Sequence, residues 1–74
     1  MKILEKFPVK NRGTGVVVHA LEEMPRTGQH LRRTTDGRQW RIEAVEAASG
    51  PGRNLALCIV GDPPSIGDEV ILCE

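Results

Sequence analysis

The chain has 74 residues, a length that fits one domain and that hides only about 60% of the unfolded surface on folding. Its residues are 39% hydrophobic but only 3% aromatic, so aliphatic side chains must fill the core, and a deep catalytic cleft does not fit in so small a domain. The formal net charge is zero, which argues against a dedicated nucleic-acid-binding domain, because such domains are usually basic.

The charges are unevenly distributed along the chain. Nine of the ten lysines and arginines precede residue 42, whereas six of the ten acidic residues follow it. Such polarity steers a charged partner to one side, lets two copies dock head to tail, or pairs complementary strands across one sheet. The third interpretation needs no partner, and we favour it.

The first strand is expected at Lys2–Val9. Ile3, Phe7 and Val9 are an even number of residues apart, so they are expected to share one apolar face, with lysines on the other. Pro8 cannot donate a hydrogen bond to a neighbouring strand, which indicates an edge position, a bulge or the end of the strand.

A glycine hinge is expected at Asn11–Gly15, where the chain reverses into a second strand at Val16–Glu22. This strand begins with three valines and is apolar on both faces, which predicts a central position in the sheet. Pro and Gly then predict a turn at Met24–Gly28. A third strand follows at Gln29–Thr35, polar apart from Leu31 and therefore mostly exposed.

The dipeptide Asp36-Gly37 lies between two strand-like runs, which predicts a hairpin with a type I′ turn. The fourth strand, Arg38–Glu46, alternates in polarity and should pair with the third strand. Trp40, Ile42 and Ala44 are expected to point to the same face, toward the core.

The rest of the chain predicts two further strands. A loop of small and breaking residues is expected at 47–53, followed by a short apolar strand at Asn54–Val60 that is expected to be fully buried. Two prolines make a rigid turn of Gly61–Gly67, and Asp68–Cys73 is the last strand. No ten-residue window has a helical period, so the sequence predicts one all-β domain over residues 1–74, a small barrel or sandwich.

The order of these features resembles the second domain of translational GTPases such as elongation factor Tu, elongation factor G and initiation factor 2. The residues that carry the resemblance are Arg12-Gly13-Thr14-Gly15-Val16-Val17-Val18, Gly28, Asp36-Gly37, Trp40-Arg41-Ile42-Glu43-Ala44-Val45-Glu46, Leu55–Val60 and Ile66-Gly67-Asp68-Glu69-Val70. The resemblance implies a six-stranded Greek-key barrel. It also implies binding to RNA, tRNA ends or protein domains rather than chemistry.

A nucleotide is not expected, because the phosphate-binding motif G-x-x-x-x-G-K-[ST] is absent from the sequence. His19 and His30 have no cysteine or aspartate nearby at metal-ligand spacing, so neither a metal nor another cofactor is expected. Cys58 and Cys73 lie in apolar runs, which favours buried reduced thiols over nucleophiles; a disulfide requires that their strands be neighbours. We therefore do not expect an enzyme.

No apolar segment typical of a secretory signal follows Met1, and no run approaches the roughly 18 apolar residues of a transmembrane helix, so a cytoplasmic location without membrane contact is expected. The candidate binding residues are six arginines, most of them around the predicted hairpin: Arg12, Arg32, Arg33, Arg38, Arg41 and Arg53. Because Trp40 is expected in the core, it is not available for base stacking. The favoured hypothesis is a non-catalytic module that docks on a protein partner or self-associates; the alternative is RNA, tRNA or ribosome binding through the arginines.

Overall fold

The computed structural model describes residues 1–10, 13–20, 24–47 and 54–74. All regular structure in these residues is β-strand, which confirms the predicted all-β class. The strands are β1 (Ile3–Val9), β2 (Gly13–His19), β3 (His30–Arg33), β4 (Gln39–Ala47), β5 (Asn54–Ile59) and β6 (Val70–Cys73). The described ranges hold no helix that is long and apolar enough to cross a membrane.

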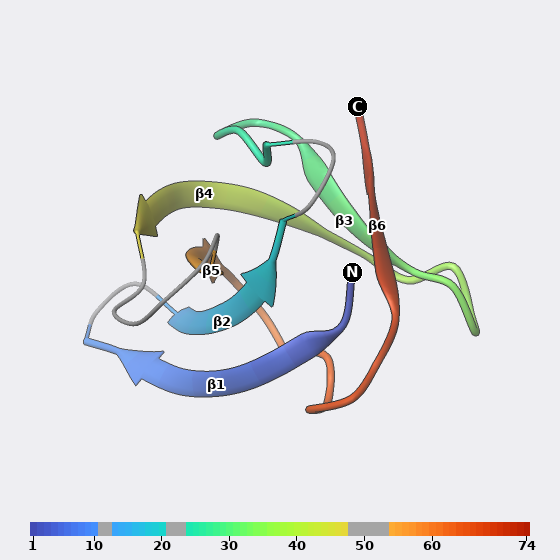
Figure 1. The fold of residues 1–74 in the computed structure, drawn as a ribbon, viewed down its shortest axis with the longest axis horizontal. Coiled ribbons are helices and arrows are strands. Elements are labelled where there is room, and N and C mark those ends of the chain that lie inside the picture. The colour runs from blue at the N-terminus through green and yellow to red at the C-terminus, as the bar shows by residue number, and fades with distance from the viewer. Residues whose placement is uncertain (11–12, 21–23, 48–53) are drawn as a thin grey trace.

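The strands form one antiparallel sheet in the order β1-β2-β5-β4-β3-β6 (Figure 1). The predicted central position of the valine strand is confirmed, because β2 pairs with β1 on one side and with β5 on the other. The predicted pairing across the hairpin is also confirmed, because β3 pairs with β4. Strands β5 and β6 are not neighbours in the sheet, and Cys58 and Cys73 form no disulfide.

The sheet curves back toward its own start but is not a closed barrel. The two border strands, β1 and β6, meet at a single bridge between Lys2 and Glu69. Backbone hydrogen bonds continue this contact from Ile3 to Gly67 and Asp68. The predicted closure is therefore not observed. Strand β6 has only four residues, and its ladder is with β3.

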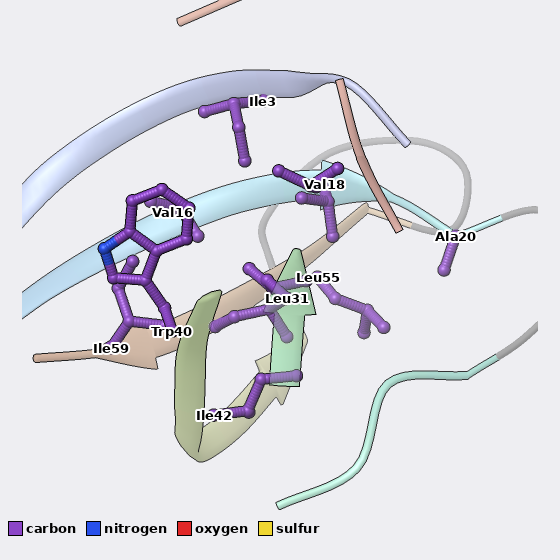
Figure 2. Packing of buried hydrophobic residues seen from close by; sticks show 11 residues of the cluster. Ile3, Val16, Val18, Ala20, Leu31, Trp40, Ile42, Leu55 and Ile59 are labelled. Carbon is purple, nitrogen blue, oxygen red and sulfur yellow. The ribbon is translucent and has the colours of Figure 1, made fainter. Parts of the chain in front are cut away.

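The core lies between the two halves of the curved sheet. Its buried side chains come from all six strands and from Ala20, which follows β2, and they point toward one another (Figure 2): Ile3, Val16, Val18, Ala20, Leu31, Trp40, Ile42, Leu55, Leu57, Ile59 and Val70. The prediction that Trp40 faces the core is confirmed, because only 3% of it is exposed. Strand β5 is central, but only Leu55, Leu57 and Ile59 are fully covered, so the predicted complete burial of this strand is wrong.

Two bulges change the faces that simple alternation predicts. In β4 the register shifts between Ile42 and Ala44, which leaves Glu43 as an extra residue. Ala44 therefore lines the outer surface with Phe7 and Cys58 instead of joining the core.

In β1 the register shifts between Ile3 and Glu5. Ile3 is buried in the core, whereas Phe7 and Val9 lie on the outer surface and Phe7 is 41% exposed. The predicted shared apolar face of Ile3, Phe7 and Val9 is therefore wrong. The edge position indicated by Pro8 is confirmed, because β1 borders the sheet.

The paired glycines are part of a strand and are not a hinge. Strand β2 begins at Gly13, whose φ of 104° is left-handed, and a Cβ there would collide with the carbonyl oxygen of Ile59. The ring of Phe7 lies against Gly15, in space that a Cβ would otherwise occupy. The glycines thus allow two close approaches across the sheet. Residues 11 and 12 of the expected hinge lie outside the described part of the chain.

The predicted hairpin is present, but its turn is wider than a two-residue type I′ turn. The N–H of Arg33 donates to the carbonyl of Arg38, and the N–H of Gly37 donates back to the carbonyl of Arg33. The loop therefore spans residues 34–37. Gly37 has a φ of 75°, and the side chain of Asp36 accepts the N–H of Arg38. This carboxylate bond favours the wider turn.

Candidate functional site

The structure separates the candidate arginines instead of collecting them into one patch. Arg33 is bound within the molecule. Its guanidinium donates two hydrogen bonds to Asp36, at 3.0 and 2.6 Å, and one to Asp68, at 3.1 Å. Asp68 also accepts the backbone N–H of Ser65 at 2.9 Å. This network, which we call the Arg33 latch (Arg33, Asp36, Asp68 and Ser65), ties the hairpin to the turn before β6.

The Arg33 latch shifts the pKa of its ionised groups in the direction that favours their charged forms. Hydrogen bonds from Arg33, and then from the backbone N–H of Arg38, hold the pKa of Asp36 well below its ordinary value. The backbone N–H of Ser65, and then Arg33, lower the pKa of Asp68. The pKa of Arg33 itself is raised, by Asp36 first and Asp68 second. An arginine held in this way is a poor ligand for phosphate.

Arg38 lies over the indole ring of Trp40, with its guanidinium carbon 5.1 Å from the ring centroid, and Arg33 lies at 5.3 Å from the same ring. The indole N–H donates to the carbonyl of Asp62 at 2.6 Å. Trp40 thus packs inward and offers no ring for stacking on a base. This contact occupies Arg38 within the fold.

Arg32, Arg38 and Arg41 are the exposed candidates among the described residues, and of these Arg32 and Arg41 make no contact with the Trp40 ring. Arg32 faces Gln39 and Ile71 in register, and Arg41 faces His30, so both lie on the outer face of β3, β4 and β6. Arg41 is 3.5 Å from Glu43, and both side chains are well exposed. Arg12 and Arg53, the remaining candidates, lie outside the described residues.

A second surface was missed by the sequence analysis. The outer face of β1, β2, β5 and residues 44–46 of β4, here called the apolar face, carries Phe7, Val9, Val17, Ala44, Ala56 and Cys58 around Gly15. Val17 is buried and yet lies outside the core cluster, because it is covered by its neighbours on this face. The signal in the sequence was the glycine at position 15, which allows Phe7 to lie flat on the sheet.

The apolar face contains a shallow hollow of about 50 Å³, lined by Phe7, Val9, Gly15, Ala44, Glu46, Ala56, Leu57 and Cys58. A small-molecule site usually has about 300 Å³ or more, whereas one water takes about 30 Å³. The hollow therefore has room for the end of one side chain. Its size and its exposed apolar rim fit a protein contact better than a substrate pocket.

The two histidines lie in different local environments. His19 Nδ1 is 2.8 Å from Oδ1 of Asn54, its partner in register on β5. His30 lies between Arg41 and Cys73 in register, and its Nδ1 is buried without a hydrogen-bond partner among the described atoms. Within the described ranges, no group of three or more His, Cys, Asp or Glu side chains is placed to hold a metal ion.

Comparisons with known proteins give no match to any family model, curated protein or solved structure.

Proposed function

We propose that this chain is a non-catalytic interaction module that binds another protein surface through its apolar face. The observation that carries the proposal is the exposure of Phe7 and of the hollow beside it on an ordered part of the sheet. Apolar surface that is rigid and ringed by polar side chains is typical of protein contacts. Because the sheet holds this surface in place, binding costs little ordering of the backbone.

The proposed architecture is an opened Greek-key barrel similar to the second domain of translational GTPases. Two observations support it: the strand order β1-β2-β5-β4-β3-β6, and the return of residues 67–70 to the start of β1. An NMR structure tests this proposal. We expect cross-strand contacts between Lys2 and Glu69, and their absence would contradict it.

The functional proposal is tested by a crosslinking pull-down that uses a tagged copy of this chain and lysate treated with nuclease. An untagged copy of the chain is added to the lysate, so that self-association is detected as well. We expect the protein that is captured to be lost with Phe7→Ser, which removes the ring from the apolar face. Ile66→Ser is the matched control, because Ile66 is also an exposed apolar residue but lies in the turn before β6. Equal capture by both variants would contradict the proposal.

The alternative function is binding of RNA, tRNA or the ribosome, and the exposure of Arg32 and Arg41 on one face favours it. Such binding would weaken steeply as salt rises, because cations released from the phosphates drive it. An Arg32→Ala and Arg41→Ala double variant would abolish it. Capture that disappears after nuclease treatment would favour this alternative over a protein partner.

A further inference from the structure

The apolar face has a negative rim. One row of side chains crosses β1, β2, β5 and β4 on this face and consists, in that order, of Glu5, Val17, Ala56 and Glu46. Neighbouring strands are about 4.8 Å apart, so the two glutamates lie roughly 14 Å from each other, at opposite ends of the row. The register of the described strands places no lysine or arginine on this face. A partner that covers it must therefore bring both apolar and positively charged groups.

The outer face of β3, β6 and residues 39–43 of β4, here called the basic face, has that chemistry. Ile71 is 38% exposed and lies directly opposite Arg32 in the register of β6 with β3. Arg41 lies on the adjacent strand of the same face, beside Glu43. An exposed aliphatic side chain can fill the apolar hollow, and the arginine beside it can pair with a carboxylate at the rim.

The two faces point away from each other. Leu31 and Val70, from β3 and β6, pack in the same core cluster as Val16 and Leu57, from β2 and β5. The two halves of the sheet thus turn their inner sides toward one core, and their outer sides lie on opposite flanks of the molecule (Figures 1 and 2). One copy can therefore offer both faces at the same time.

We propose that the occupant of the apolar face is the basic face of a second copy of this chain. This inference rests on the proposed function and names its partner. Ile71 of one copy enters the hollow beside Phe7 of the next, and Arg32 lies against the Glu46 end of the row. Burial of the apolar side chain supplies affinity, and the charge pair sets the orientation.

Charge also selects against the other way of joining two copies. If two apolar faces met, each Glu5 and Glu46 would approach carboxylates of the other copy, with no lysine or arginine among the described residues of that face to compensate them. Contact between unlike faces avoids this repulsion, and it repeats from copy to copy. Such head-to-tail contact gives rings or open chains whose size depends on concentration.

Sedimentation velocity of the full chain tests the proposal, between about 10 µM and 1 mM at low salt, the range in which a small interface associates. We expect the sedimentation coefficient of the natural chain to rise across this range. Arg32→Glu places a glutamate against Glu46, and Glu46→Arg places an arginine against Arg32, so each variant alone should lose at least about tenfold in association. Arg26→Glu is the matched control, since Arg26 is exposed and belongs to none of the strands that form the two faces, and it should associate normally.

The decisive experiment is to mix the two variants and measure their association. The Arg32→Glu copy keeps Glu46, and the Glu46→Arg copy keeps Arg32, so the mixture should regain association that neither variant shows alone. A failure of either variant to fold, checked by circular dichroism, would not produce this recovery. No recovery from two folded variants would overturn the proposal.

Other outcomes separate this inference from the proposed function. A natural chain that stays monomeric at 1 mM overturns the inference. If Phe7-dependent capture of a different protein is then observed, the proposed function stands; if it is absent, both proposals fail. Association that requires added RNA also overturns the inference, because the basic face would then be occupied by nucleic acid.

Discussion

The hairpin end of the sheet and the apolar face use their side chains in opposite ways. At the hairpin end, Arg33, Arg38 and Trp40 are engaged in bonds and ring contacts within the molecule. On the apolar face, Phe7 remains partly open to solvent, and its ring lies against the backbone at Gly15. The comparison teaches that Arg33 and Arg38 of the hairpin contribute to the fold, whereas the apolar face is open to contact.

The largest effect is expected for Gly13→Ala, which disturbs the backbone beneath the apolar face. The added Cβ meets the Ile59 carbonyl, and φ is unfavourable, so the free energy of unfolding should fall by about 2–4 kcal/mol. Urea denaturation followed by Trp40 fluorescence measures it. Gly28→Ala is the control: its φ is 96° but its Cβ would meet nothing, so it should cost about 1 kcal/mol. Equal losses would show that the close approach to Ile59 is unimportant.

The next effect tests the hairpin end. Trp40→Phe removes the indole N–H that bonds to Asp62 and weakens the contacts with Arg33 and Arg38. We expect a loss of about 2 kcal/mol, mainly from the carbonyl left without its partner and from the smaller ring. Thermal unfolding by circular dichroism measures it, because the only tryptophan is lost. Phe7→Leu, on the exposed apolar face, should cost clearly less, and the reverse order would contradict the comparison.

A smaller effect is expected for Gly15→Ala. The new methyl group displaces the ring of Phe7, but this ring is partly exposed and can swing away, so the cost should be about 1 kcal/mol or less. The double variant with Phe7→Ala separates the causes, since Gly15→Ala should be neutral or stabilising once the ring is gone. A large loss in that background would place the constraint in the backbone instead.

The smallest effect is expected for Arg33→Gln, and the difference in stability from the natural chain should shrink further as the pH falls. The pKa values of Asp36 and Asp68 are lowered in the folded state, whereas the unfolded value is about 3.9. Their contribution is therefore fully present above about pH 5 and is lost as the pH falls through their folded pKa values. Urea titrations from pH 6 to pH 2 should show a steeper decline for the natural chain than for Arg33→Gln. Arg32→Gln should keep the steep decline; parallel curves for all three would contradict the role of the latch.

The strands and the pairing of β3 with β4 were predictable because they depend on local signals. The valine run of β2, the Asp36-Gly37 pair and the alternation around Trp40 each act within a few residues. The faces of Phe7 and Ala44 were not predictable by alternation, since each follows a bulge that depends on the neighbouring strand. The wider turn depends on the Asp36 carboxylate.

The candidate site was predictable only as a set of charges. Counting arginines does not show that Arg33 has a partner outside the hairpin, because Asp68 is distant in sequence and approaches Arg33 only in the folded sheet. The apolar face also requires the fold, because it is formed by residues from four strands. The sequence pattern therefore indicated where charged residues are present, but not which of them are available to bind a partner.

Pro8 sits on the border strand of the sheet and has no amide hydrogen to offer a further strand. Growth of copies by strand addition along that edge, the route to cross-β fibres, is thereby discouraged. The molecule can thus expose an apolar surface without forming fibres along this edge. Any assembly through its faces should dissociate on dilution.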